Sequence, residues 1–104
     1  YNWAWYGAGD LLFRPAVEDH QAGTVAEFAA ALAAHTGAVW LAGELGAELL
    51  AALAAAEGVG HVVCIDPVSD MRRGGQLARL AALHLDAGTC DAIETLQPLY
   101  LRNP

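Results

Sequence analysis

Two short apolar runs, separated by a segment of helix length, constrain the fold of this chain more than any other feature. Residues 38–42 and 62–65 are apolar, and the second run is continuous and rich in β-branched side chains. This pattern is typical of buried parallel strands that are covered on both faces. Between them, a helix is predicted over residues 46–57, with an apolar face made of Leu49, Leu50 and Leu53.

The amino-terminal part predicts a hairpin followed by a helix. Aromatic residues at 1–6 and a second run at 11–14 favour two strands joined by a turn at 7–10. Thr24 is followed three residues later by Glu27, which is the spacing of a helix capping box. Apolar residues then recur at helical spacing and predict a buried stripe of Val25, Phe28, Ala29 and Leu32.

The carboxy-terminal part predicts one more helix and a tail. This helix is expected to start at Asp66 or Ser69 and to stop before Gly88. Its two adjacent glycines, at 74 and 75, are expected to allow close packing against a neighbouring element. The order of elements predicts a single α/β domain over residues 1–104, a mixed sheet with helices on its faces.

The charge of the chain excludes several classes of function. The formal net charge is −7, and all five basic residues are arginines. A nucleic-acid-binding surface should be basic, because phosphate neutralisation supplies most of the non-specific affinity, so direct nucleic-acid binding is not expected. Lysine chemistry on phosphates or carbonyl groups is excluded because the chain has no lysine.

The sequence predicts no membrane span, metal centre or catalytic nucleophile. No apolar run approaches the ~20 uncharged residues that a span needs, and no secretory signal is visible, so a cytoplasmic protein is expected. The four histidines share no ligand spacing, and His61 and Cys64 project to opposite faces of a strand. The two thiols, Cys64 and Cys90, are expected to be idle. We therefore expect neither a cofactor nor catalysis.

Gly43 and Gly46 lie at the junction of a predicted strand and helix, where backbone N–H groups can hold a phosphate. Two interpretations stay open, a structural turn or a nucleotide site, and the negative charge of Glu44 favours the structural turn. A second polar group is expected to cap the start of the last helix, or else to face a cleft: Asp66, Ser69 and Asp70.

Aromatic residues at both ends of the chain are candidates for interaction. On a strand, Tyr1, Trp3 and Trp5 share one face, which either packs on a helix or forms a partner surface. After Pro98 ends any helix, the tail is expected to dock the side chains of Tyr100 and Leu101.

Three segments together resemble the TsaB family, the non-catalytic, actin-like subunits of the bacterial machinery that makes threonylcarbamoyladenosine on tRNA. They are the ending Pro-Leu-Tyr-Leu-Arg at 98–102, the aromatic run at 1–6 and the Val-Trp-Leu-Ala-Gly-Glu-Leu-Gly segment at 39–46. The resemblance implies a ribonuclease-H-like (actin-like ATPase) lobe that corresponds to the carboxy-terminal lobe of this glycoprotease-like family. The family's amino-terminal lobe is expected to be absent from these 104 residues.

This resemblance implies a scaffold or activator subunit that acts in tRNA processing through protein–protein interaction. Its partners would be the catalytic threonylcarbamoyl-transfer subunit and the small ATPase subunit of the complex. Because the family's central strand would be missing, a homo-oligomer is also expected. The candidate interaction residues are Trp3, Trp5, Tyr100 and Arg102. Two alternatives stay open: the nucleotide-binding half of an actin-like kinase or acyl-transfer protein, and an unrelated α/β binding module.

Overall fold

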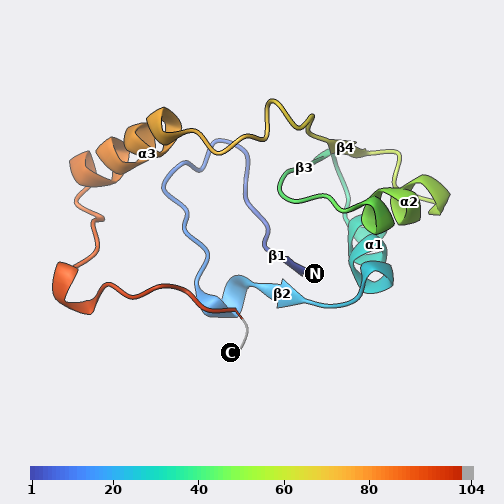
Figure 1. Cartoon of the computed structure of the whole chain (residues 1–104), viewed down its shortest axis with the longest axis horizontal. Helices are drawn as coiled ribbons and strands as arrows, with labels where there is room; N and C mark the ends of the chain where they lie inside the picture. The colour runs from blue at the N-terminus through green and yellow to red at the C-terminus, as the bar shows by residue number, and fades with distance from the viewer. Residues whose placement is uncertain (102–104) are drawn as a thin grey trace. The chain divides into compact units, whose positions relative to one another are not determined.

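The structure is a computed structural model and describes residues 1–101. It contains three helices and four short strands, arranged in two two-stranded sheets (Figure 1). The chain divides into two compact units. The first unit contains Tyr1 and residues 22–71, and the second contains residues 2–21 and the chain from residue 72 on. The α/β class predicted from the order of elements is confirmed.

Helix α1 (Val25–Ala34) starts at the predicted capping box. The Glu27 amide donates a hydrogen bond to Thr24 Oγ1 at 3.2 Å, and the Thr24 amide donates to Glu27 Oε2 at 2.7 Å. Two amide donors at the helix start are therefore satisfied reciprocally. The helix ends at Ala34, with His35 as its C-cap, and Gly37 takes the positive φ of 96° beyond it.

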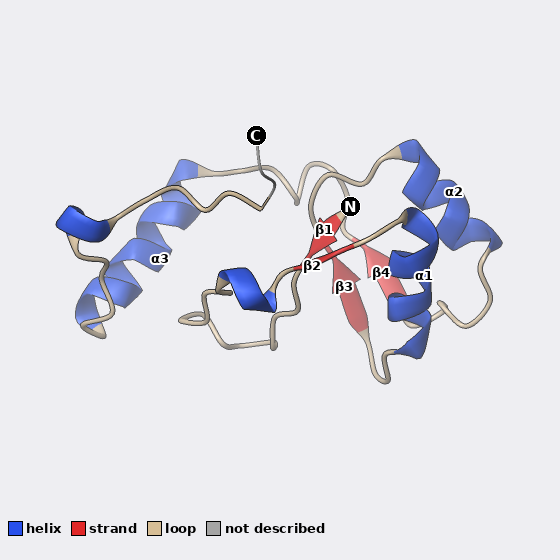
Figure 2. Ribbon diagram, turned by 90° about the horizontal axis from the view of Figure 1, so that it is seen from below, coloured by secondary structure: helices blue, strands red, loops and turns tan. Residues whose placement is uncertain are grey.

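Strands β3 (Val39–Leu41) and β4 (Val62–Cys64) form the predicted parallel pair, connected through helix α2 (Ala47–Ala55) (Figure 2). Trp40 lies in register with Val63. Bonds at both ends of the ladder fix this register, from the Val39 amide to the His61 carbonyl at 3.0 Å and from the Ile65 amide to the Leu41 carbonyl at 2.9 Å.

Among residues 1–101, every buried apolar side chain belongs to the first unit, and together they form its core. Its described members come from α1, β3 and α2: Phe28, Ala29, Leu32, Val39, Leu41 and Leu49. The expectation that the strands are covered on both faces is wrong. Side chains alternate along a strand, so burial of Val39 and Leu41 turns Trp40 outward, where 74% of its surface is exposed. In α2, only Leu49 of the predicted face is buried, and Leu50 is exposed.

The predicted amino-terminal hairpin is wrong. Strand β1 (Asn2–Trp3) pairs with β2 (Gln21–Ala22), and residues 11–14 form no strand. The chain turns again where the second strand was expected to begin: the Leu11 amide donates a hydrogen bond to the Gly9 carbonyl at 3.1 Å, and residues 11–12 are in a turn. A short 3-10 helix, Val17–Asp19, precedes β2.

Helix α3 (Gly74–Asp86) begins later than predicted. The Asp66 carboxylate accepts hydrogen bonds from the amides of Val68 and Ser69, at 3.1 and 2.9 Å, and this closes a separate turn instead of starting a helix. The expected stop at Gly88 is confirmed by its φ of 69°. An added Cβ at Gly74 or Gly75 would meet no atom within 4 Å, so the expected close packing is wrong.

The remaining described chain is a short 3-10 helix, Ile93–Thr95, followed by an irregular tail. The prediction that the tail docks Tyr100 is wrong, since 76% of this residue is exposed, and Leu101 is exposed as well. No described helix is both long enough and apolar enough to cross a bilayer.

Candidate functional site

The Gly43 amide in the turn after β3 is already bonded to a carboxylate of the chain itself. It donates a hydrogen bond to Asp70 Oδ2 at 2.7 Å, and Gly43 adopts a φ of 123° that favours glycine. Asp70 lies in the turn after β4, so the bond connects the loops at the carboxyl ends of two parallel strands. Ligands often bind at this edge of an α/β sheet. Here a phosphate would have to displace Asp70 from the Gly43 amide.

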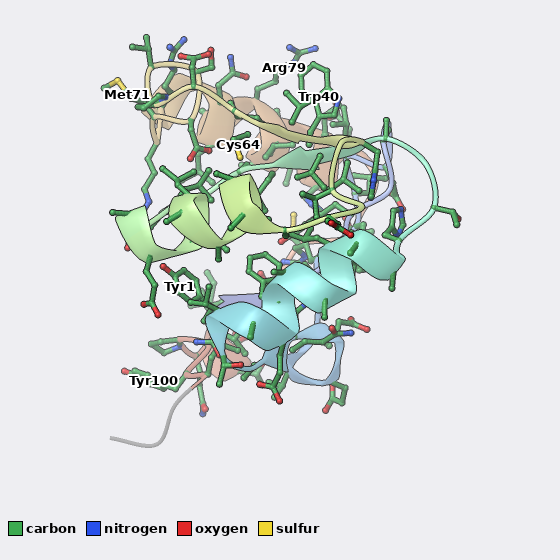
Figure 3. All side chains as sticks on the ribbon, turned by 90° about the vertical axis from the view of Figure 1, so that its right-hand side faces the viewer. Tyr1, Trp40, Cys64, Met71, Arg79 and Tyr100 are labelled. Atoms are coloured by element: carbon green, nitrogen blue, oxygen red, sulfur yellow. The ribbon has the colours of Figure 1, made fainter. Side chains whose placement is uncertain are left out.

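The contact with Tyr1 (labelled in Figure 3) explains why position 46 is a glycine. Gly46 is the N-cap of α2, and a Cβ built at this position would lie only 2.6 Å from the Tyr1 hydroxyl oxygen. The Tyr1 ring in turn stacks against Phe28, with centroids 6.3 Å apart and planes inclined by 27°. The glycine therefore makes room for an aromatic ring that packs beside the core.

The turn that follows β4 is held by Asp66. A side-chain hydrogen bond with Ser69, together with the Ser69 and Val68 amides, lowers the pKa of Asp66 below its ordinary value. The carboxylate is therefore favoured in its charged form, as expected for a group that satisfies backbone donors. This agrees with the interpretation of Asp66 as a capping residue, although it caps a turn and not a helix.

Two of the four histidines have separate hydrogen-bonding partners. A ring nitrogen of His61 lies 2.9 Å from the Leu32 carbonyl oxygen, and Nδ1 of His84 lies 2.7 Å from Thr89 Oγ1. Among residues 1–101, no three or more His, Cys, Asp or Glu side chains gather where they would hold a metal ion. Both thiols, Cys64 and Cys90, are exposed and free.

The predicted interaction residues are spread over the chain. Trp3 and Trp5 are half-buried, whereas Tyr100 is largely exposed in the tail. Arg102 lies outside the described residues.

Sequence reasoning missed the outward face of the parallel strand pair. Trp40 and Val63 are neighbours in register, and 52% of Val63 is exposed beside the exposed indole. We define these two residues as the outer sheet face. The signal was present in the alternation of the strand, because Trp40 stands between two aliphatic residues that face the core.

Sequence reasoning also missed two features of the second unit. Arg14 forms an ion pair with Asp91 at 2.6 Å and donates to the Thr89 carbonyl at 3.2 Å. In addition, an open groove of about 420 Å³ lies along α3. One residue from the turn after β1 and four residues from one face of α3 line this groove: Leu11, Gln76, Arg79, Leu80 and Leu83.

Comparison with known proteins identifies no relative of this chain. No family model matches the chain, and neither a curated protein nor a solved structure shows significant similarity to it.

Proposed function

We propose that this chain is a TsaB-like, ribonuclease-H-like lobe that acts as a non-catalytic scaffold or activator in tRNA threonylcarbamoyladenosine formation. The support is the resemblance of three sequence segments, together with a strand–helix–strand unit of the parallel type. In this proposal, the chemistry belongs to the catalytic threonylcarbamoyl-transfer subunit. This chain contributes a binding surface for that subunit or for the small ATPase subunit.

The observation that carries the proposal is the outer sheet face. Parallel strands are usually covered on both faces, yet here one face packs on the core and the other presents Trp40 to solvent. Tryptophan is enriched among the residues that dominate protein interfaces, and exposed apolar neighbours commonly mark interaction sites. An apolar partner surface that covers Trp40 and Val63 would complete the burial that this kind of sheet normally has.

The test is direct binding to the catalytic subunit, measured by titration calorimetry with and without the small ATPase subunit. The double variant Trp40→Gln, Val63→Thr should weaken binding at least about tenfold, because a central aromatic anchor at an interface is worth roughly 2 kcal/mol or more. Ile93→Thr, at an exposed aliphatic residue of the second unit, is the matched control and should bind like the parent.

The same titration includes the outcomes that reject the proposal. If the parent chain binds neither subunit, the scaffold function is wrong. If it binds and the double variant binds equally well, the outer sheet face is not the contact surface. Circular dichroism of each variant establishes that the helices are intact in both cases.

A further inference from the structure

Helix α3 presents an unburied face whose side chains repeat at helical spacing. Gln76, Arg79, Leu80 and Leu83 line the groove, and they occupy positions i, i+3, i+4 and i+7 of one helix surface. None of the residues of α3 is buried, and Leu77, on one flank of this face, is 70% exposed. A stripe with this spacing is complementary to another helix, whose side chains follow the same period.

One flank of the face carries two opposite charges. Arg79 and Asp86 are two helical turns apart and therefore lie on the same side of the leucine stripe. Within residues 1–101, neither side chain forms an ion pair or hydrogen bond with another side chain or with the backbone of a neighbouring element. The helix thus offers a cation and an anion at a spacing that an antiparallel copy of itself would match.

We propose that two copies of this chain associate through α3, with the two helices antiparallel about a two-fold axis. Leu80 then packs against Leu83 of the second copy, and Arg79 lies opposite Asp86 of the second copy. Because the interface is isologous, each contact occurs twice. On the other flank, Leu77 faces His84 of the second copy. Leu11 forms the side wall that the incoming helix meets. Charged residues that flank an apolar seam set the orientation of helix pairs.

This association does not depend on the proposed function, because it uses α3 and not the outer sheet face. The occupant is a second copy and not an unrelated helix, since both charges needed for pairing are present on the same flank of α3 itself. In a parallel arrangement, the flank that carries Arg79 and Asp86 would instead face the flank of Leu77 and His84, so neither charge would meet its opposite.

Sedimentation equilibrium of the full chain, at several concentrations and at low and high salt, tests the inference. The parent should dimerise reversibly and more weakly at high salt, since exposed ion pairs are screened. Arg79→Glu places two acidic groups opposite each other, and Asp86→Arg places two basic groups there. Each variant should raise the dimer dissociation constant by about tenfold or more.

The decisive measurement mixes these two variants. A copy with Arg79→Glu and a copy with Asp86→Arg restore both opposite-charge contacts, so the mixture should form a heterodimer that neither variant forms with itself. Arg72→Glu and Glu57→Arg change the net charge by the same amounts at positions off this face, and should dimerise like the parent. The Trp40→Gln, Val63→Thr variant should dimerise like the parent as well.

Two results would overturn the inference. One is a parent chain that stays monomeric at all concentrations, which would mean that the α3 face does not pair with a second copy. The other is a dimer that persists in Arg79→Glu and in Asp86→Arg and shows no preference for the mixed pair. Circular dichroism of both variants verifies that α3 remains helical, so loss of the dimer is attributable to the charges.

Discussion

At the scale of single residues, the capping box of α1 shows how closely a short pattern can determine local geometry. Glu27 accepts from the Thr24 amide and from the Thr24 hydroxyl, at 2.7 and 3.0 Å. Both bonds lower the pKa of Glu27 in the folded chain, and the bond from the Thr24 amide makes the larger contribution. A carboxyl group whose pKa is depressed on folding stabilises the folded state above its unfolded pKa, and this contribution is lost as the pH falls through the folded pKa.

Glu27→Gln should therefore weaken the dependence of the free energy of unfolding on pH in the acid range. In the parent, the free energy of unfolding should fall from about pH 5 to pH 3 as Glu27 takes up a proton. The glutamine keeps an acceptor for Thr24 but does not titrate, so part of this decrease should disappear. Urea unfolding followed by circular dichroism at each pH measures it. Glu57→Gln, at an exposed residue after α2, is the control, and an equal flattening there would contradict the assignment to Glu27.

At the scale of elements, local signals predicted the first unit well and the second unit poorly. The Thr24 box and the β-branched run of β4 depend on neighbours in sequence, and both elements formed as expected. The start of α3 was missed because Asp66 bonds nearby amides in a turn that competes with the helix. The exposure of Trp40 was missed because its burial depends on whether another element covers the strand pair. The sequence does not show which elements do so.

The glycines of α3 permit a test at the same scale. Gly75 has helical geometry and open space around it, so Gly75→Ala should stabilise α3 by roughly 0.5–1 kcal/mol through reduced backbone entropy. Gly88 has a φ of 69°, and Gly88→Ala should destabilise the helix end despite equally open space. The helical circular dichroism signal and its urea midpoint measure both. A loss of stability in Gly75→Ala would show that a neighbouring element packs against this position.

At the scale of the whole molecule, the two units differ in what holds them together. Every buried apolar residue among those described belongs to the first unit, and the described part of the second unit has none. A helix of the length of α3 is marginal in water without packing. The two units should consequently open with different free energies.

Hydrogen exchange followed by mass spectrometry should resolve this difference. In dilute solution, amides of α1 should exchange slowly, because Phe28 and Leu32 pack in the core, and amides of α3 should exchange far faster. Raising the protein concentration should protect α3 if it pairs with a second copy. Equal protection of α1 and α3 in dilute solution would contradict the assignment of the core to the first unit alone.

The ion pair between Arg14 and Asp91 has a consequence for the order in which the chain folds. The two residues are 77 positions apart, and the chain between them includes residues 22–71 of the first unit. Closing such a long loop costs entropy, and an exposed ion pair contributes at most about 1 kcal/mol towards it. Contacts between α1, β3 and α2 need much shorter closures and form sooner. The segment in the middle of the sequence should therefore fold first, and Arg14 and Asp91 should meet last, after folding of the intervening residues has shortened the distance between them.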